Sequence, residues 1–230
     1  HRQCRRQRQM CIRDRPSLKQ AVNSLGTGHG YLTLDVTSPE AAEQAMLGSI
    51  QKFGGLDILI SNAGAAHAGP MLSISEDDLR GAFELNFFSH YSFSTAAAKI
   101  FRNQNRGGQI IFNISKQAVN PGKNFGAYGM PKATTFFLMK QLALELGANG
   151  IRVNGVNADR IRSGLLTDDF ISSRAKSRGV SESDYMAGNL LNKEVTAEHV
   201  ADAFTSLACA ESTTGHVMTV DGGNIEASLR

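Results

Sequence analysis

The apolar residues of this 230-residue chain alternate between short β-rich runs and longer stretches with helical periodicity. The runs are bounded by polar or glycine-containing segments, which is typical of strands buried in a parallel sheet. We predict strands at 31–36, 56–62, 109–114, 151–157 and 217–220. We predict helices at 17–25, 38–53, 75–99, 127–147 and 196–208, with Ser38 before Pro39 and Ser75 before Asp78 as start signals. This alternation predicts an α/β fold with a doubly wound parallel sheet.

The first fifteen residues differ in composition from the rest of the chain. They hold six arginines against one aspartate and show no hydrophobic period. Because the stretch 5–15 resembles a sequencing adapter translated in frame, we expect 1–15 to be a non-native leader and 16–230 to be the domain. Without the leader the chain keeps 24 − 6 = 18 basic and 21 − 1 = 20 acidic side chains, so the charge that would suggest nucleic acid disappears. The alternative is a genuine basic arm for RNA or a membrane.

Cysteine use and hydropathy bear on the compartment. Two of the three cysteines lie in the expected leader, which leaves Cys209 without an internal disulfide partner. The sequence contains neither a signal peptide nor an apolar run of about 18 residues. We therefore expect a cytoplasmic protein with no membrane and no nucleic-acid partner.

Residues capable of chemistry follow the carboxyl ends of three predicted strands, where ligands bind in an open α/β sheet. Asn62, Ala63 and Gly64 follow one strand, and the glycine allows either close approach to a ligand or a plain turn. Ser115 ends the next strand and Asn157 ends the one after it. The chemistry should converge at this edge of the sheet.

Tyr128 and Lys132 lie four residues apart near the start of a predicted helix, so their side chains share one face. An ammonium beside a phenol favours the phenolate and brings a group of pKa near 10 into range for proton transfer. Pro131 between them is tolerable in the first helical turn. Taken alone, such a pair is usually an ordinary surface tyrosine and lysine.

Together these motifs resemble the short-chain dehydrogenase/reductase family. The features are a strand ending in N-A-G, the helical Asn86, Ser115 after the next strand, the Y-x-x-x-K pair Tyr128 and Lys132, and a late V-D-G-G. The resemblance runs from about residue 32 to 223 and implies an oxidoreductase that acts on a small molecule with NAD, or NADP, as cofactor.

The resemblance also implies residue roles. Tyr128 would be the catalytic acid/base and a cofactor contact, with Lys132 as its pKa partner and ribose ligand. Ser115 would orient the substrate, and Asn86 would anchor a proton-relay water. Contacts with the adenosine part of the cofactor would come from Asp35, Val36, Asn62, Ala63 and Gly64.

The chain departs from the family pattern in three places. The usual serine pair reads Ser115-Lys116, and counting back from Tyr128 selects Ser115 whereas counting from Asn113 selects Lys116. The usual Pro-Gly pair after Asn157 reads Ala-Asp. A glycine-rich phosphate loop and the acidic residue that selects NAD over NADP are not found, so we expect the domain to lack its first strand, that loop and its second strand.

A narrower resemblance covers about residues 107–230. It is to the C-terminal half of bifunctional aldolase/short-chain dehydrogenases, in which a class II aldolase releases L-lactaldehyde and the dehydrogenase half oxidises it. This implies a fused N-terminal aldolase, a homo-oligomer, and L-lactaldehyde or a related small hydroxylated aldehyde or alcohol as substrate in rhamnose-type catabolism. Lys116, Arg160 and Arg162 are the candidate substrate contacts, 161–191 is a candidate lid, and no metal site is expected because the histidines lack ligand spacing.

Two other functions compete with this one. A generic alcohol or 3-oxoacyl reductase of the same family would share all these motifs. A non-catalytic binding module would explain the altered Ser-Lys and Ala-Asp positions. The joint presence of Asn86, Ser115, Tyr128 and Lys132 favours an enzyme.

Overall fold

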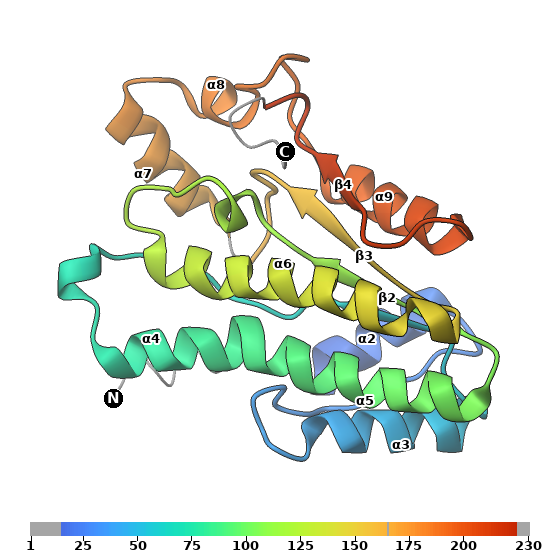
Figure 1. Cartoon of the computed structure of the whole chain (residues 1–230). Helices are drawn as coiled ribbons and strands as arrows, with labels where there is room; N and C mark the ends of the chain where they lie inside the picture. The colour runs from blue at the N-terminus through green and yellow to red at the C-terminus, as the bar shows by residue number, and fades with distance from the viewer. Residues whose placement is uncertain (1–14, 165, 225–230) are drawn as a thin grey trace.

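The computed structural model describes residues 15–164 and 166–224 and contains one parallel sheet (Figure 1). The four strands run in the order β1 (Ile58–Ser61), β2 (Gly108–Asn113), β3 (Ile151–Ala158) and β4 (Val217–Val220). Each pairs in parallel with the next, so their carboxyl ends meet at one edge of the sheet. The predicted α/β fold class is confirmed.

Helices cover both faces of the sheet. The α-helices are α2 (Arg15–Leu25), α3 (Ala41–Phe53), α4 (Glu76–Phe83), α5 (Ser89–Gln104), α6 (Gly126–Leu146), α7 (Asp168–Arg178), α8 (Glu182–Met186) and α9 (Ala197–Cys209). The short helical turns are η1 (Met71–Ser73), η2 (Glu84–Phe88), η3 (Lys116–Ala118) and η4 (Gly147–Asn149). Helices α5 and α6 pack on one face, with α3 outside α5, and α9 packs on the other face (Figure 1).

The two faces of the sheet are covered unequally. On the α5–α6 face, Phe101 and Met139 are fully buried against the strands. On the α9 face, Leu207 packs against β2 and β3, but the cover stops short of β1. Ile58 and Ile60 are therefore 41% and 51% exposed. Strand β1 is an edge strand with an open face.

The helical segment that begins after Ser75 changes its pitch on the way. Ser75 is the N-cap as predicted, because its Oγ accepts a hydrogen bond from Asp78 N at 3.1 Å. After α4 the chain makes a π-helical turn, η2, and then continues as α5 to Gln104. The single helix predicted at 75–99 is thus two α-helices joined by a π turn.

The predicted strand at 31–36 is wrong. In residues 15–164 and 166–224 no strand lies beside this segment, so its backbone groups have no ladder to join. It ends instead in a turn in which the Asp35 carboxylate accepts hydrogen bonds from Thr37 N and Thr37 Oγ1 at 2.9 and 2.7 Å. The predicted cap at Ser38 is also wrong, since Ser38 N closes this turn onto Asp35 O at 2.9 Å and α3 begins at Ala41.

The segment 161–191 forms two short helices, α7 and α8, around a small apolar cluster that includes Ile171, Tyr185 and Met186. Its described residues contain no strand, as the sequence predicts. None of the helices in the described part of the chain is long and apolar enough to span a bilayer. The expected leader lies outside the described residues, apart from Arg15.

Candidate active site

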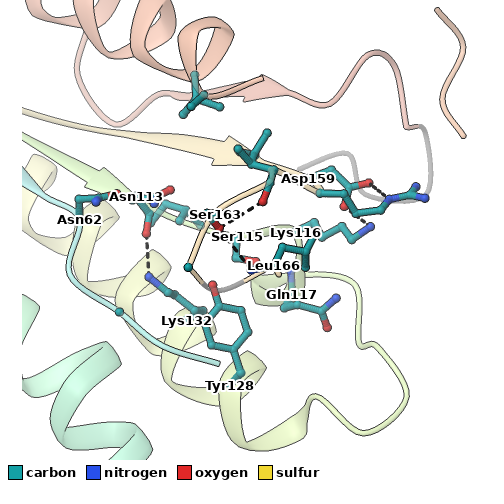
Figure 2. Close-up of a pocket in the computed structure, with 18 of the residues that line it drawn as sticks. Asn62, Asn113, Ser115, Lys116, Gln117, Tyr128, Lys132, Asp159, Ser163 and Leu166 are labelled. Atoms are coloured by element: carbon teal, nitrogen blue, oxygen red, sulfur yellow. Dashed lines mark hydrogen bonds and ion pairs between the residues drawn. The ribbon is translucent and has the colours of Figure 1, made fainter. Parts of the chain in front are cut away.

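A cleft of about 1140 Å³ opens at the carboxyl ends of the strands. It is lined by the open face of β1, the ends of β2 and β3, the start of α6, and residues of α7, α8 and α9. Figure 2 shows Asn62 and Asn113 on one side of Tyr128 and Lys132, and Lys116 and Asp159 on the other. The three strands thus bring the predicted residues to one place, as expected for a parallel sheet.

Ser115 lies where β2 gives way to η3. Its backbone is extended, its side chain is buried, and its Oγ accepts a hydrogen bond from Gln117 N at 3.3 Å. The same hydroxyl hydrogen-bonds to the phenol of Tyr128. Ser115 therefore faces Tyr128, whereas Lys116 begins η3 and points away from it (Figure 2).

Tyr128 and Lys132 stand on the first two turns of α6. Lys132 is only 2% exposed, and its Nζ donates a hydrogen bond to Asn113 O at 2.9 Å. Burial lowers the pKa of Lys132 to about 8. Because α6 begins at Gly126, Pro131 is in the second turn of the helix and not in the first as the sequence led us to expect.

The sequence predicts that Lys132 lowers the pKa of Tyr128, and this is wrong for the structure described. Burial raises the pKa of Tyr128, and the hydrogen bond with Ser115 only partly offsets that rise. The Lys132 ammonium hydrogen-bonds to Asn113 O at the end of β2, and it lies 5.9 Å from the centre of the Tyr128 ring. At neutral pH Tyr128 therefore keeps its proton.

Asn86 lies in the π turn and is 1% exposed. Its Nδ2 donates to Ala65 O at 3.0 Å and to Ala82 O at 3.1 Å, and its Oδ1 accepts from Ala65 N at 3.3 Å. Its main-chain oxygen accepts a hydrogen bond from Thr135 Oγ1 on α6 at 2.7 Å. Asn86 thereby connects the turn after β1 to α4 and α6. Its role as a water anchor stays a prediction.

The turn after β1 passes close to this cluster. A Cβ atom at Gly64 would lie 2.8 Å from Asn86 Oδ1 and 3.6 Å from Lys132 Nζ, so only glycine fits. Asn62 Oδ1 accepts a hydrogen bond from Asn113 Nδ2 at 2.6 Å. Asn62 and Gly64 line the cleft, whereas Ala63 and the predicted adenine contacts Asp35 and Val36 are outside its lining.

Sequence reasoning missed His90, which is 1% exposed on α5. Its Nδ1 lies 2.6 Å from Ser61 Oγ at the end of β1, and its Nε2 has no hydrogen-bond partner among the described residues. Burial, followed by the charge of Lys132, holds its pKa well below the ordinary value. His90 is a neutral support for the turn, and its place four residues after Asn86 is the only signal that the sequence offered.

Lys116 has a partner already. Its ammonium forms an ion pair with Asp159, which also accepts from Arg160 Nε at 3.2 Å and from Asn224 Nδ2 at 2.9 Å. Burial lowers the pKa of Lys116 although Asp159 opposes this. Burial would raise the pKa of Asp159, but Lys116, Arg160 and Asn224 together lower it. The Lys-Asp departures from the family pattern thus belong to one interaction.

The two predicted substrate arginines differ in position. Arg160 lines the cleft, but it donates to the carbonyls of Tyr185 and Gly188 and stacks 5.0 Å from the centre of the Tyr185 ring. Arg162 is outside the cleft lining and pairs with Asp168 and Glu194 at 2.6 and 2.8 Å. The structure does not bring Arg162 to the cleft.

Comparisons with known proteins agree with this geometry. A family model described as enoyl-(acyl carrier protein) reductase matches residues 10–224. An uncharacterized oxidoreductase of Bacillus subtilis, YuxG, is 33% identical over 83% of this chain, and the match spans only 29% of that relative's length. L-2,3-butanediol dehydrogenase of Corynebacterium glutamicum is 30% identical over 84% of this chain and 77% of its own.

A solved structure is similar as well. Acetoin dehydrogenase of Enterobacter cloacae superimposes with a TM-score of 0.77 at 28% identity, covering 94% of this chain and 82% of that one. Shared sequence, shared fold and the Ser115–Tyr128–Lys132 grouping point the same way. The chain therefore belongs to the short-chain dehydrogenase/reductase family, whose members are NAD(P)-dependent oxidoreductases.

Proposed function

We propose that this chain transfers hydride between a nicotinamide cofactor and a small hydroxylated aldehyde or alcohol, with L-lactaldehyde as the leading substrate. The observation that carries the proposal is the meeting of Ser115, Tyr128 and Lys132 in one cleft. The relatives named for butanediol and acetoin act on small molecules with oxygen on neighbouring carbons. Hydrated lactaldehyde has the same arrangement.

Tyr128 and Ser115 handle the substrate oxygen. Ser115 holds the oxygen beside the phenol, and Tyr128 takes a proton from the hydroxyl in oxidation or gives one to the carbonyl in reduction. When bound, the nicotinamide accepts or supplies the hydride. Because burial raises the pKa of Tyr128, oxidation should accelerate with rising pH, as more of the phenol loses its proton.

The residues present fit a dinucleotide. Lys132 has three donors, and Asn113 O takes one of them, which leaves donors for ribose hydroxyls. Gly64 keeps the turn after β1 free of a side chain, and Asn62 offers an amide beside it. We propose NAD as the cofactor, with Asp35, Val36, Asn62, Ala63 and Gly64 on the adenosine side.

The wider setting is also part of the proposal. We propose a cytoplasmic homo-oligomer, acting in rhamnose-type catabolism, whose parent protein carries an N-terminal class II aldolase. The match spans 29% of the Bacillus relative, so that relative has much additional sequence, as a fusion requires.

One observation favours the reductive direction as a second candidate. A Tyr128 that keeps its proton at neutral pH is ready to protonate a carbonyl oxygen. An alcohol or 3-oxoacyl reductase would work in this way.

The test is turnover followed by NADH absorbance. L-Lactaldehyde with NAD is compared with acetoin and a 3-oxoacyl thioester with NADH, across neutral and alkaline pH. Tyr128→Phe should abolish every activity, whereas Tyr91→Phe, which alters an exposed tyrosine on α5, should change none. Turnover that survives Tyr128→Phe would refute the proposal, and turnover of acetoin alone would replace lactaldehyde.

A further inference from the structure

Two arginines on α7 reach the cleft and have no role in the chemistry proposed above. Arg174 and Arg178 are four residues apart, share one face of the helix and line the cleft. Within residues 15–164 and 166–224, neither forms an ion pair with a carboxylate. By contrast, Arg162 at the entrance to α7 pairs with two.

Aromatic rings hold both guanidinium groups. Arg174 lies 5.4 Å from the centre of the Phe125 ring, and Arg178 lies 5.1 Å from that of Tyr185. Stacking uses the flat face of a guanidinium and leaves its N–H edge for an acceptor. The Nε–H of Arg174 is buried and has no hydrogen-bond partner among the described residues. A buried donor of this kind is unfavourable until an acceptor reaches it.

The charges around this end of the cleft are unbalanced. Lys116, Arg160, Arg174 and Arg178 line it, and among the described residues Asp159 is the one carboxylate in the cleft lining. Burial is the main cause that lowers the pKa of Lys116, and the charges of Arg160 and Arg178 lower it further. The positive charge of Arg178 therefore acts on Lys116, the residue that follows Ser115.

We infer that Arg174 and Arg178 bind an anionic group of the substrate, a phosphate or a carboxylate, in the cleft that holds Ser115 and Tyr128. The planar fork of a guanidinium matches both groups and forms paired, charge-assisted hydrogen bonds with them. The inference rests on the proposed function, but it replaces the neutral L-lactaldehyde named there by an anionic substrate class: 2-hydroxy acids and phosphorylated hydroxyaldehydes or alcohols.

The cofactor's phosphates offer the same chemistry, but the position of the arginines favours the substrate. Arg174 rests on Phe125, three residues before Tyr128, and Arg178 lies near Lys116 and Tyr185. Figure 2 shows Lys116 on the side of Tyr128 opposite Asn62, the residue that we propose for the adenosine side.

The experiment compares two matched pairs of substrates: glyceraldehyde with glyceraldehyde 3-phosphate, and propane-1,2-diol with lactate. We expect kcat/KM to be roughly 10- to 100-fold higher for the anionic member of at least one pair. Arg174→Gln/Arg178→Gln should remove this preference, and Arg174→Lys/Arg178→Lys, which keeps the charge without the fork, should retain part of it. Lys176→Gln is the matched control, because Lys176 is exposed on the same helix and outside the cleft lining, and it should keep the full preference.

Two further measurements separate the outcomes. Calorimetric titration with inorganic phosphate tests the site even if no substrate turns over; binding that the double glutamine variant abolishes supports the inference, and binding equal in both proteins overturns it. The Kd for NADH tests the cofactor: a double variant that binds NADH at least tenfold more weakly while keeping the anionic preference would give the site to the cofactor and overturn it. Equal kcat/KM for both members of each pair in the wild type would overturn it too.

Discussion

The two sides of the cleft hold their functional groups by different means. Ser115 follows the end of a central strand, and Tyr128 and Lys132 stand on a 21-residue helix, where burial is the main cause of their shifted pKa values. We call these residues the floor. Across from them, the α7–α8 segment (Asp168–Met186) packs around its own small apolar cluster. It is joined to the rest of the cleft by Arg160, which pairs with Asp159 and stacks on Tyr185, and by Arg174, which stacks on Phe125. The floor belongs to the main core of the sheet, whereas the α7–α8 segment rests on a small cluster and a few side-chain contacts, so the floor should be the more rigid side.

The largest effect should come from Ser115→Ala. Loss of the hydroxyl removes a hydrogen bond to the substrate oxygen, and we expect kcat to fall roughly 100- to 1000-fold, as for other donors at a reacting oxygen. The melting temperature should change little. Steady-state kinetics and thermal unfolding measure the two effects. For Lys116→Met we expect the opposite pattern: a lower melting temperature and little change in kcat. An equal loss of kcat in both variants would contradict the difference between the floor and the opposite side of the cleft.

Asp159→Asn should destabilise the α7–α8 segment. The substitution leaves Lys116, which is mostly buried, without its carboxylate, so we expect the free energy of unfolding to fall by about 2 kcal/mol. Urea titration measures this loss, and hydrogen exchange should show faster opening of 168–186 than of α6. Asp169→Asn, at an exposed position on α7, is the control; protection lost equally in α6 would contradict the separation.

Lys132→Met should stabilise the protein although it removes a side chain that we propose for cofactor binding. Burial lowers the pKa of Lys132 from 10.5 to about 8, so the charged form costs stability at neutral pH. We expect a gain on the order of 1–2 kcal/mol at pH 7. Between pH 8 and 10.5 the native wild type loses this proton before the unfolded chain does, so its stability should rise relative to the variant. Urea titrations across that range test whether the free energy of unfolding of the wild type rises relative to that of the variant. Lys140→Met, at an exposed lysine of α6, is the control.

Arg162→Gln should have the smallest effect. Its ion pairs with Asp168 and Glu194 are exposed, and such pairs contribute little in water. We expect no resolvable change in melting temperature or in kcat/KM. A clear loss of kcat/KM would restore Arg162 as the substrate contact that its sequence position suggests.

The sequence predicted the central elements because their signal is local. Strands β1, β2, β3 and β4 contain compact apolar runs, and Ser75 carries its own cap partner. The segment 31–36 has the same kind of run but no neighbouring strand in the described chain, so pattern alone misjudged it. A strand depends on a partner that its own residues do not encode.

The site was predictable where a motif fixes spacing along the chain. Ser115, Tyr128 and Lys132 meet as the motif implies. Arg174 and Arg178 were missed because arginines on a polar helix look like solvated surface, and their stacking on Phe125 and Tyr185 is a tertiary contact. The pKa of Tyr128 was misjudged because burial is invisible in a spacing rule.

The π turn at Glu84–Phe88 has a consequence for the phase of the helix that carries it. A π turn accommodates one residue more than an α turn, and each residue of an α-helix rotates its successors by about 100°. Deleting one residue from 84–88 would therefore rewind the segment to regular pitch and turn Asn86 away from Ala65 or His90 away from Ser61, since both cannot be kept. The π turn therefore sets the rotation of α5 relative to α4. This rotation lets Asn86 bond to the loop after β1 while His90 bonds to Ser61 at the end of that strand.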